Sequence, residues 1–220
     1  MERTIRVTGK GRIFVKPDTI RLQITQESVE NTYEGAVRES AEKKRQLNDA
    51  LEKFGFAGND LKTLYFNVDT EYESYQDKNK CWKKRLVGYK YTHRMKLEFP
   101  SDNKLLSRVL LAVARCPGKP EFTISFTVAD KEAAKNELLA KAVEDSKAKA
   151  AVLTAAAGVQ LKEVLTIDYS WGEMDFVTRP MNEKICVSMA DGMDDAGIDM
   201  DIEADDIDVT DTVTVVWAIA

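Results

Sequence analysis

The sequence predicts an α+β fold in which helices pack on mainly antiparallel sheets. Along the 220 residues, the hydrophobic pattern changes between the two-residue period of strands and the three-to-four-residue period of helices. The order strand, helix, strand, strand over residues 20–99 recurs over residues 122–219, which indicates a pseudo-repeat. We therefore expect one domain of two strand-helix-strand-strand halves, about 1–100 and 119–220, joined by a short helix at about 101–115.

The first half begins with a predicted hairpin. Apolar residues alternate up to Gly9-Lys10-Gly11, which has the composition of a turn, and they resume at Ile13. The turn is favoured over a phosphate-binding loop, because the segment is too short and no Ser or Thr follows it. The other elements predicted in this half are a strand at 20–26, a helix at 31–54, and strands at 61–72 and 89–99.

The second half is organised around an alanine-rich helix predicted at 130–157. Gly158 stands where a helix C-cap glycine belongs. Mostly small side chains recur on one face, which lets a helix lie close to a sheet. Because residues 150–157 carry no charge, we expect the C-terminal half of this helix to be the more deeply buried. The predicted face consists of Leu138, Ala142, Ser146, Lys149, Leu153 and Ala157, and the remaining strands are expected at 122–128, 164–171 and 208–219.

The composition argues against several classes of protein. A formal net charge of -5 argues against a general nucleic-acid binder, and no apolar run approaches the roughly 18 residues of a membrane span. The N-terminus enters a strand pattern directly, without the apolar region of a secretory signal. The sequence as it stands therefore predicts a cytoplasmic protein, or a periplasmic or cell-envelope protein if a leader was removed. Cys81, Cys116 and Cys186 form no CxxC pair, so reduced structural thiols are favoured over a disulfide or metal site.

Two segments of opposite charge are the candidate functional sites. One is basic and carries a tryptophan, and it is expected to be the exposed tip of a hairpin; the alternative is a surface that binds an anionic ligand or partner. The other spans residues 191–211 and contains ten acidic residues and no Lys or Arg. The basic segment comprises Lys78, Lys80, Trp82, Lys83, Lys84 and Arg85.

The acidic segment has oxygen ligands of the type that Ca²⁺ prefers. The candidate ligands are Asp199, Asp201, Glu203 and Asp205, but no glycine falls at the sixth position that an EF-hand loop requires. A solvated loop over 191–206 is therefore favoured over a cation site. Since the two charged segments occupy equivalent places in the predicted repeat, we expect them to meet, either within the chain or between subunits of a homo-oligomer.

No catalytic constellation is visible in the sequence. The single histidine, His93, lies on the apolar face of a predicted strand, where a core imidazole with a hydrogen-bond partner is favoured over a metal ligand or a base. No G-x-S-x-G motif accompanies any serine. We predict no catalytic residue and no cofactor, and hence no enzyme.

Five short motifs lie along the chain: Val7-Thr8-Gly9-Lys10-Gly11, Lys16-Pro17-Asp18, Gly88-Tyr89, Gly158-Val159-Gln160-Leu161 and Val213-Thr214-Val215-Val216-Trp217. Together they resemble the SIMPL-domain family, which includes periplasmic immunogenic proteins and many bacterial proteins of unassigned function. The resemblance implies an α+β fold, large ring-like or channel-like homo-oligomers, and roles at the cell envelope or in stress tolerance without an established reaction. The leading interpretation is a non-enzymatic, self-associating protein, and the alternative is a binding module that uses the basic tip.

Overall fold

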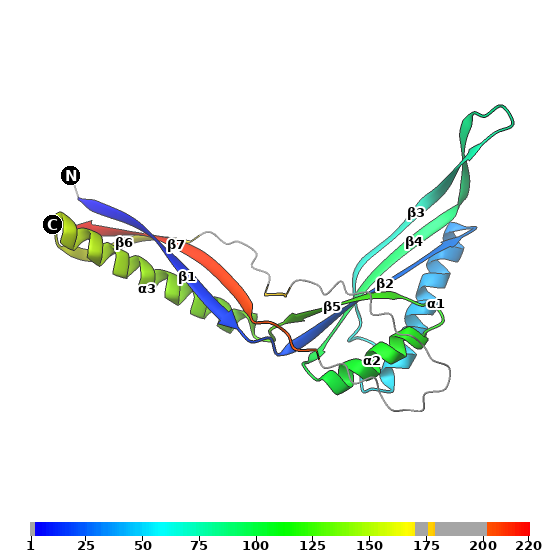
Figure 1. The fold of residues 1–220 in the computed structure, drawn as a ribbon, viewed down its shortest axis with the longest axis horizontal. Coiled ribbons are helices and arrows are strands. Elements are labelled where there is room, and N and C mark those ends of the chain that lie inside the picture. The colour runs from blue at the N-terminus through cyan, green and yellow to red at the C-terminus, as the bar shows by residue number, and fades with distance from the viewer. Residues whose placement is uncertain (1–2, 170–175, 179–201) are drawn as a thin grey trace. The chain divides into compact units, whose positions relative to one another are not determined.

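The computed structural model describes residues 3–169, 176–178 and 202–220, and these form two compact units (Figure 1). The sheets are built from antiparallel strand pairs and carry helices, which confirms the predicted α+β class. The order strand, helix, strand, strand occurs twice. The elements are β1 (Thr4–Val15), β2 (Thr19–Glu30), α1 (Tyr33–Glu52), β3 (Lys62–Gln76), β4 (Trp82–Pro100), α2 (Asn103–Arg115), β5 (Glu121–Thr127), α3 (Lys131–Ala157), β6 (Leu161–Asp168) and β7 (Ile207–Ile219).

The first unit is a three-stranded sheet with one helix. It comprises the described residues of 1–18, 127–178 and 204–220, and its strand order is β1-β7-β6. Both strand pairs are antiparallel, and α3 packs on β1 and β7. Segments from both ends of the chain thus share one sheet, while the division into sequence halves at about 100 and 119 stays a prediction.

The predicted hairpin at Gly9-Lys10-Gly11 is wrong, because β1 runs without a turn from Thr4 to Val15. The two glycines lie instead beneath α3. A Cβ atom at Gly9 would overlap the carbonyl oxygen of Ala142, and one at Gly11 would overlap that of Leu138. The glycines therefore allow a close approach of helix and strand, which a period-two pattern cannot distinguish from a turn.

The small-residue face of α3 is only partly as predicted. Leu138, Ala142 and Ser146 are buried, but the buried row then continues at intervals of four through Ala150 and Thr154. Val152 is 69% exposed and Leu153 is 51% exposed, so the expectation of a more deeply buried C-terminal half is wrong. Only one narrow row of side chains reaches the sheet, and the uncharged residues beside that row remain in solvent.

Polar side chains of α3 also bond to the backbone of β1, which is an edge strand of its sheet. Asp145 Oδ2 accepts the backbone N–H of Lys10 at 2.7 Å, and the Ser146 hydroxyl donates to the Val7 carbonyl at 3.2 Å. An unpaired strand edge is a template for association, and covering it with a helix prevents this. The β1 edge is therefore protected by α3.

The second unit is a four-stranded sheet that carries α1 and α2. Its strand order is β3-β4-β2-β5, and the pairs β2/β4 and β3/β4 are antiparallel. The alternation predicted between residues 89 and 99 is confirmed, since Tyr91, His93, Met95, Leu97 and Phe99 are all buried. The helices begin where their capping side chains predict, because Thr32 accepts the Gly35 N–H and Asp102 accepts the N–H groups of Lys104 and Leu105.

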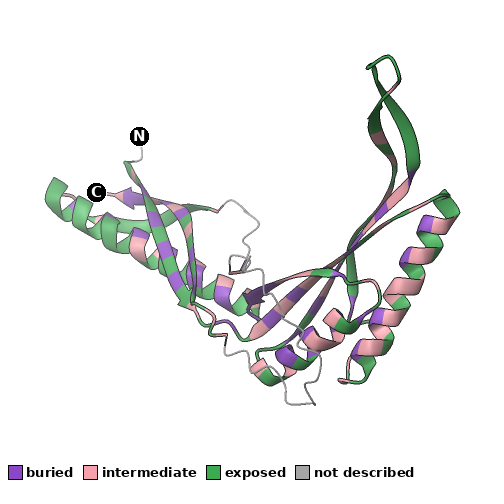
Figure 2. Cartoon of the chain, turned by 45° about the vertical axis from the view of Figure 1, so that its right-hand side comes forward, coloured by how far each residue is buried: buried purple, intermediate pink, exposed green. Residues whose placement is uncertain are grey.

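Strands β3 and β4 continue together beyond the end of β2. Glu30, the last residue of β2, pairs with Tyr89, so residues 82–88 pair only with β3. Strand β4 consequently begins seven residues earlier than predicted. We call residues 71–76 and 82–88, with the turn 77–81 that joins them, the ribbon; it is exposed over most of its length (Figure 2).

Candidate functional site: the ribbon

The turn at the end of the ribbon is organised by Asp77. Its carboxylate oxygen Oδ1 accepts the backbone N–H groups of Asn79 and Cys81, at 2.9 and 3.0 Å. The hydrogen bond from Lys83, together with the backbone N–H of Cys81, holds the pKa of Asp77 below its usual value. The carboxylate therefore stays charged at neutral pH and neutralises Lys83.

Lys80 adopts a left-handed backbone conformation in this turn, with φ of 60°. A side chain with a Cβ atom is strained there, so Lys80→Gly is expected to stabilise the turn by about 0.5–1 kcal/mol. Amide hydrogen exchange would show this as slower exchange of the Lys80 and Cys81 amides. Lys78→Gly is the control, because Lys78 has no positive φ, and it is expected to speed exchange. Equal effects of the two changes would contradict the prediction.

The strand register divides the ribbon into two faces. Trp82 pairs with Gln76, Lys84 with Ser74, and Leu86 with Tyr72, so these six side chains lie on one face. A bulge leaves Val87 unpaired and resets the alternation toward the rest of the sheet. We call the first set the apolar face, because it carries Tyr72, Trp82 and Leu86, which are 53%, 72% and 49% exposed.

The opposite face of the ribbon carries ion pairs. Lys83 lies 2.9 Å from Asp77 Oδ2, and Arg85 bonds Glu73 and stacks over the Tyr75 ring. By contrast, the side chains of Lys78, Lys80 and Lys84 make no ion pair in the part of the chain that the structure describes. The structure thus brings the six predicted residues to one hairpin but separates paired from unpaired cations.

Sequence reasoning did not include Tyr72 and Leu86 in the candidate site. Both belong to the apolar face only because the bulge at Val87 sets Leu86 opposite Tyr72. Tyrosines at 72 and 75 and the apolar pair 86–87 were visible in the sequence, but the register that sorts them is a property of strand pairing.

The acidic segment is described only in part. Asp199 and Asp201 lie outside the described residues, while Glu203 and Asp205 are exposed and precede β7. Among described residues, no group of three or more His, Cys, Asp or Glu side chains could hold a metal ion. A cation on the acidic loop and its meeting with the basic segment stay predictions.

Two of the three cysteines lie in the described part of the chain, and their predicted reduced state stays a prediction. Cys81 is exposed in the ribbon turn, Cys116 is buried after α2, and both are free. Burial raises the pKa of the Cys116 thiol, which disfavours the reactive thiolate. Cys186 lies outside the described residues.

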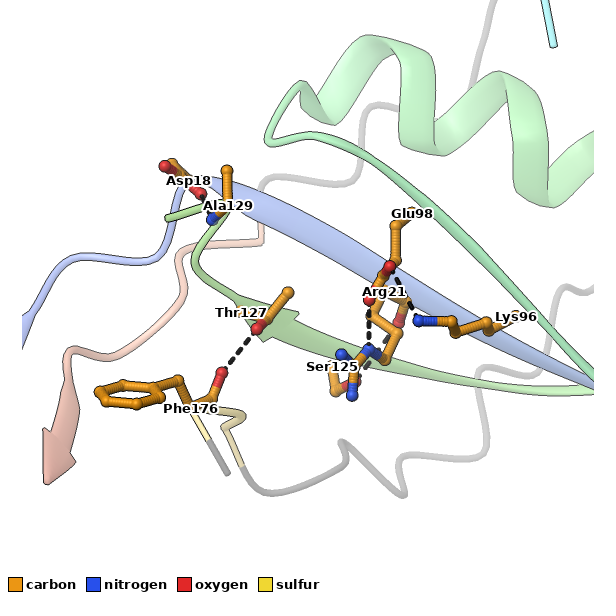
Figure 3. A network of polar contacts seen from close by, with 8 residues as sticks. All are labelled: Asp18, Arg21, Lys96, Glu98, Ser125, Thr127, Ala129 and Phe176. Atoms are coloured by element: carbon orange, nitrogen blue, oxygen red, sulfur yellow. Dashed lines mark hydrogen bonds and ion pairs between the residues drawn. The ribbon is translucent and has the colours of Figure 1, made fainter. Parts of the chain in front are cut away.

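A charged cluster lies on the sheet of the second unit. Arg21 and Lys96 both contact Glu98, at 2.7 and 3.0 Å (Figure 3), beside a depression of about 260 Å³ lined by Asp60, Lys62, Lys96 and Glu98. Burial raises the pKa of Glu98, but hydrogen bonds from Lys96 and Arg21 outweigh burial and lower it. A general acid needs the opposite shift, so the cluster is suited to holding strands together.

His93 is a core residue with hydrogen-bond partners, as predicted. Its Nδ1 lies 3.0 Å from the Ser40 hydroxyl on α1, and its Nε2 lies 2.9 Å from the Thr63 hydroxyl on β3. Ser40 is buried and has no access to a substrate. Burial, reinforced by nearby Lys44, lowers the pKa of His93, so the imidazole is neutral and links three elements.

The residues of the short motifs serve the fold. Gly9 and Gly11 admit α3, Gly158 caps it with φ of 69°, and a Cβ atom at Gly88 would overlap the Glu30 carbonyl. Asp18 accepts the Ala129 N–H at 2.8 Å, and close by in the same unit Thr127 donates to the Phe176 carbonyl (Figure 3). These motif positions therefore have structural explanations without a bound ligand.

Comparison with known proteins agrees with the motifs. No helix in the described part of the chain is both long and apolar enough to cross a membrane. The 26 kDa periplasmic immunogenic protein of Brucella melitensis is 27% identical over 166 residues, which cover 74% of this chain and 65% of the relative. The model of the SIMPL family, described as a protein of unknown function (DUF541), matches residues 5–217. The chain therefore belongs to the SIMPL family.

Proposed function

We propose that this chain is a non-enzymatic SIMPL protein that associates with copies of itself and serves as a scaffold. The observation that carries the proposal is β3, a strand of 15 residues at the edge of the four-stranded sheet. Most of its residues are exposed, and within the described residues no hydrogen bond joins a helix side chain to its backbone, as α3 side chains do for β1.

The exposed side chains of β3 favour association. Leu64, Tyr65 and Phe66 are neighbours, and all three are exposed to solvent. Long, exposed and apolar edge strands pair readily with another strand. Pairing of β3 with β3 of a second copy would be self-complementary, as a two-fold axis requires.

The ribbon adds a second argument for a partner. An isolated two-stranded hairpin is only marginally stable in water, because it has no packed face. Residues 71–76 and 82–88 form such a pair beyond the end of β2. A surface that covers the ribbon would stabilise it.

The name of the Brucella melitensis relative supports a periplasmic location for the scaffold. That protein is named a periplasmic immunogenic protein. We propose the periplasm or another part of the cell envelope for this chain as well. A scaffold role agrees with a family of unknown function. It also agrees with the two side chains considered for catalysis, because Glu98 is held in an ion pair and Ser40 is buried.

Light scattering coupled to size exclusion tests self-association. The native chain is expected to have a discrete mass at least twice that of one 24.8 kDa chain. Leu64→Lys with Tyr65→Lys is expected to reduce the mass to that of one chain, since buried lysines oppose pairing. Val152→Lys with Leu153→Lys is the control, because it places the same charges on exposed apolar residues of α3. A native monomer would contradict the proposal.

A second candidate function is a binding module at the ribbon. The observation that favours it is the separation of the two faces, since Lys78, Lys80 and Lys84 make no ion pair with any described residue and lie beside an exposed tryptophan. An anionic partner would neutralise these charges.

A further inference from the structure

We infer that the ribbon docks on the surface of an anionic phospholipid bilayer through its apolar face. The inference rests on the second of the two proposed functions and names its partner. The residues that carry it are Tyr72, Trp82 and Leu86, together with Lys78, Lys80 and Lys84.

The aromatic content of the face fits the boundary between lipid headgroups and hydrocarbon. Tryptophan and tyrosine are enriched at that depth, because each has an apolar body and a polar tip. Trp82 is the more exposed of these aromatic residues, and Leu86 lies on the same face of the strand, beyond Lys84. The three side chains can therefore enter the headgroup region together.

The three lysines of the ribbon that make no ion pair with a described residue complement an anionic surface. Lys84 lies on the apolar face, and Lys78 and Lys80 lie in the turn at its end. Long lysine side chains can bury their stems and keep their ammonium groups at the headgroups. Each lysine near an anionic bilayer strengthens binding about fivefold, so three together contribute about a hundredfold.

A bilayer fits these residues better than a second protein chain does. Interfaces between proteins are depleted of lysine and enriched in arginine, whereas bilayer surfaces attract both. The one arginine of the ribbon, Arg85, is bonded to Glu73 on the opposite face. The carboxylate of Asp208, in the acidic segment, also already has a partner within its own unit, since Arg12 donates to both of its oxygens at 2.8 and 2.7 Å.

Cosedimentation with vesicles tests the inference on the full-length chain. We expect binding to phosphatidylcholine vesicles that contain one-third phosphatidylglycerol, and little binding to pure phosphatidylcholine. Lys78→Gln with Lys80→Asn and Lys84→Gln is expected to weaken binding about a hundredfold. Asparagine is chosen at 80 because it tolerates a positive φ. Trp82→Ser is expected to weaken binding about tenfold, through lost apolar burial.

The matched control removes three exposed lysines elsewhere. Lys53→Gln with Lys104→Gln and Lys147→Gln changes the net charge equally and is expected to leave binding unchanged. Circular dichroism checks that each variant is folded. Absence of binding to the anionic vesicles, or equal losses in the ribbon and control variants, overturns the inference.

The solution mass separates this inference from self-association. The ribbon variants are expected to keep the native mass, while the Leu64 and Tyr65 variant changes it. If the ribbon variants lower the mass and leave vesicle binding intact, a second copy occupies the ribbon and the bilayer assignment is wrong. If the native chain is a monomer that still binds anionic vesicles, self-association fails and the bilayer assignment stands.

Discussion

Gly9→Ala is expected to lower the free energy of unfolding by about 3 kcal/mol, because the added methyl group has no room beneath α3. The nearest atoms to that methyl group would be the Ala142 carbonyl oxygen, the Ser146 backbone nitrogen at 2.5 Å and the Ser146 Cβ at 2.8 Å. Backbone atoms of a helix cannot move aside as a flexible side chain can. The helix must therefore lift from β1.

The lifting of α3 has a further cost. Ser146 would lose its hydrogen bond to Val7, and Asp145 would lose its bond to the Lys10 backbone. Both losses expose the β1 edge, so the variant is also expected to aggregate more readily. Urea denaturation followed by circular dichroism measures the stability.

Gly58→Ala is the matched control for Gly9→Ala. A Cβ atom at Gly58 would meet only the Asn48 side-chain nitrogen, at 3.8 Å, which is an ordinary contact. Its φ is not in the left-handed region, so the change is expected to be neutral or stabilising by about 0.4–1 kcal/mol. If the two alanine variants have the same stability, the close approach of α3 and β1 does not exist in solution.

His93→Ala is expected to cost about 3 kcal/mol of stability, from the cavity and from the buried Ser40 hydroxyl left without a partner. The imidazole joins Ser40 on α1 to Thr63 on β3 and lies edge-to-face against Phe66 at 5.3 Å between ring centroids. Ser40→Ala removes only one of these contacts and is the milder comparison, at about 1 kcal/mol. Equal stability of His93→Ala and the wild type would contradict the role of His93.

The effect of His93 is also expected to depend on pH. The folded state lowers the pKa of His93, so the unfolded chain binds the proton more readily than the folded chain. The stability that the neutral imidazole contributes is complete above about pH 6.5 and declines as the pH falls through the lower folded-state pKa.

Urea titrations between pH 8 and pH 5 measure this dependence. The difference in stability between the wild type and His93→Ala is expected to shrink below about pH 6.5, because the unfolded wild type takes up a proton at residue 93 that the folded state disfavours and the variant cannot bind. A difference that grows on acidification would mean that the folded state favours the imidazolium.

Helices and inner strands of the second unit were predictable from local pattern. Apolar residues in β2 and β4 alternate with polar ones, and Ile20, Leu22 and Ile24 are buried as their period requires. Thr32 and Asp102 cap α1 and α2 through side chains that contact residues two or three positions away. Such features depend on residues that are close in the sequence, so they can be predicted without a tertiary structure.

The position of the candidate site in the chain could be predicted, but the arrangement of its side chains on two faces could not. A basic segment with one tryptophan between two strand patterns indicates a hairpin end. Which cations are neutralised depends on Asp77 and Glu73 lying beside Lys83 and Arg85, and on the bulge at Val87. These contacts join residues through strand register, which composition does not specify.

By itself, the sequence determined the α+β class, the order of the elements and membership of the SIMPL family. Only the tertiary structure decided that Gly9 and Gly11 lie under a helix, that α3 buries a single row ending at Thr154, and that the ribbon has an apolar face. The physical reason is the range of the interactions. Hydrophobic period and capping act within a few residues of one element. Helix-to-strand distance depends on residues as far apart as Ser146 and Val7, and register depends on which residues of two different strands pair, such as Tyr72 and Leu86.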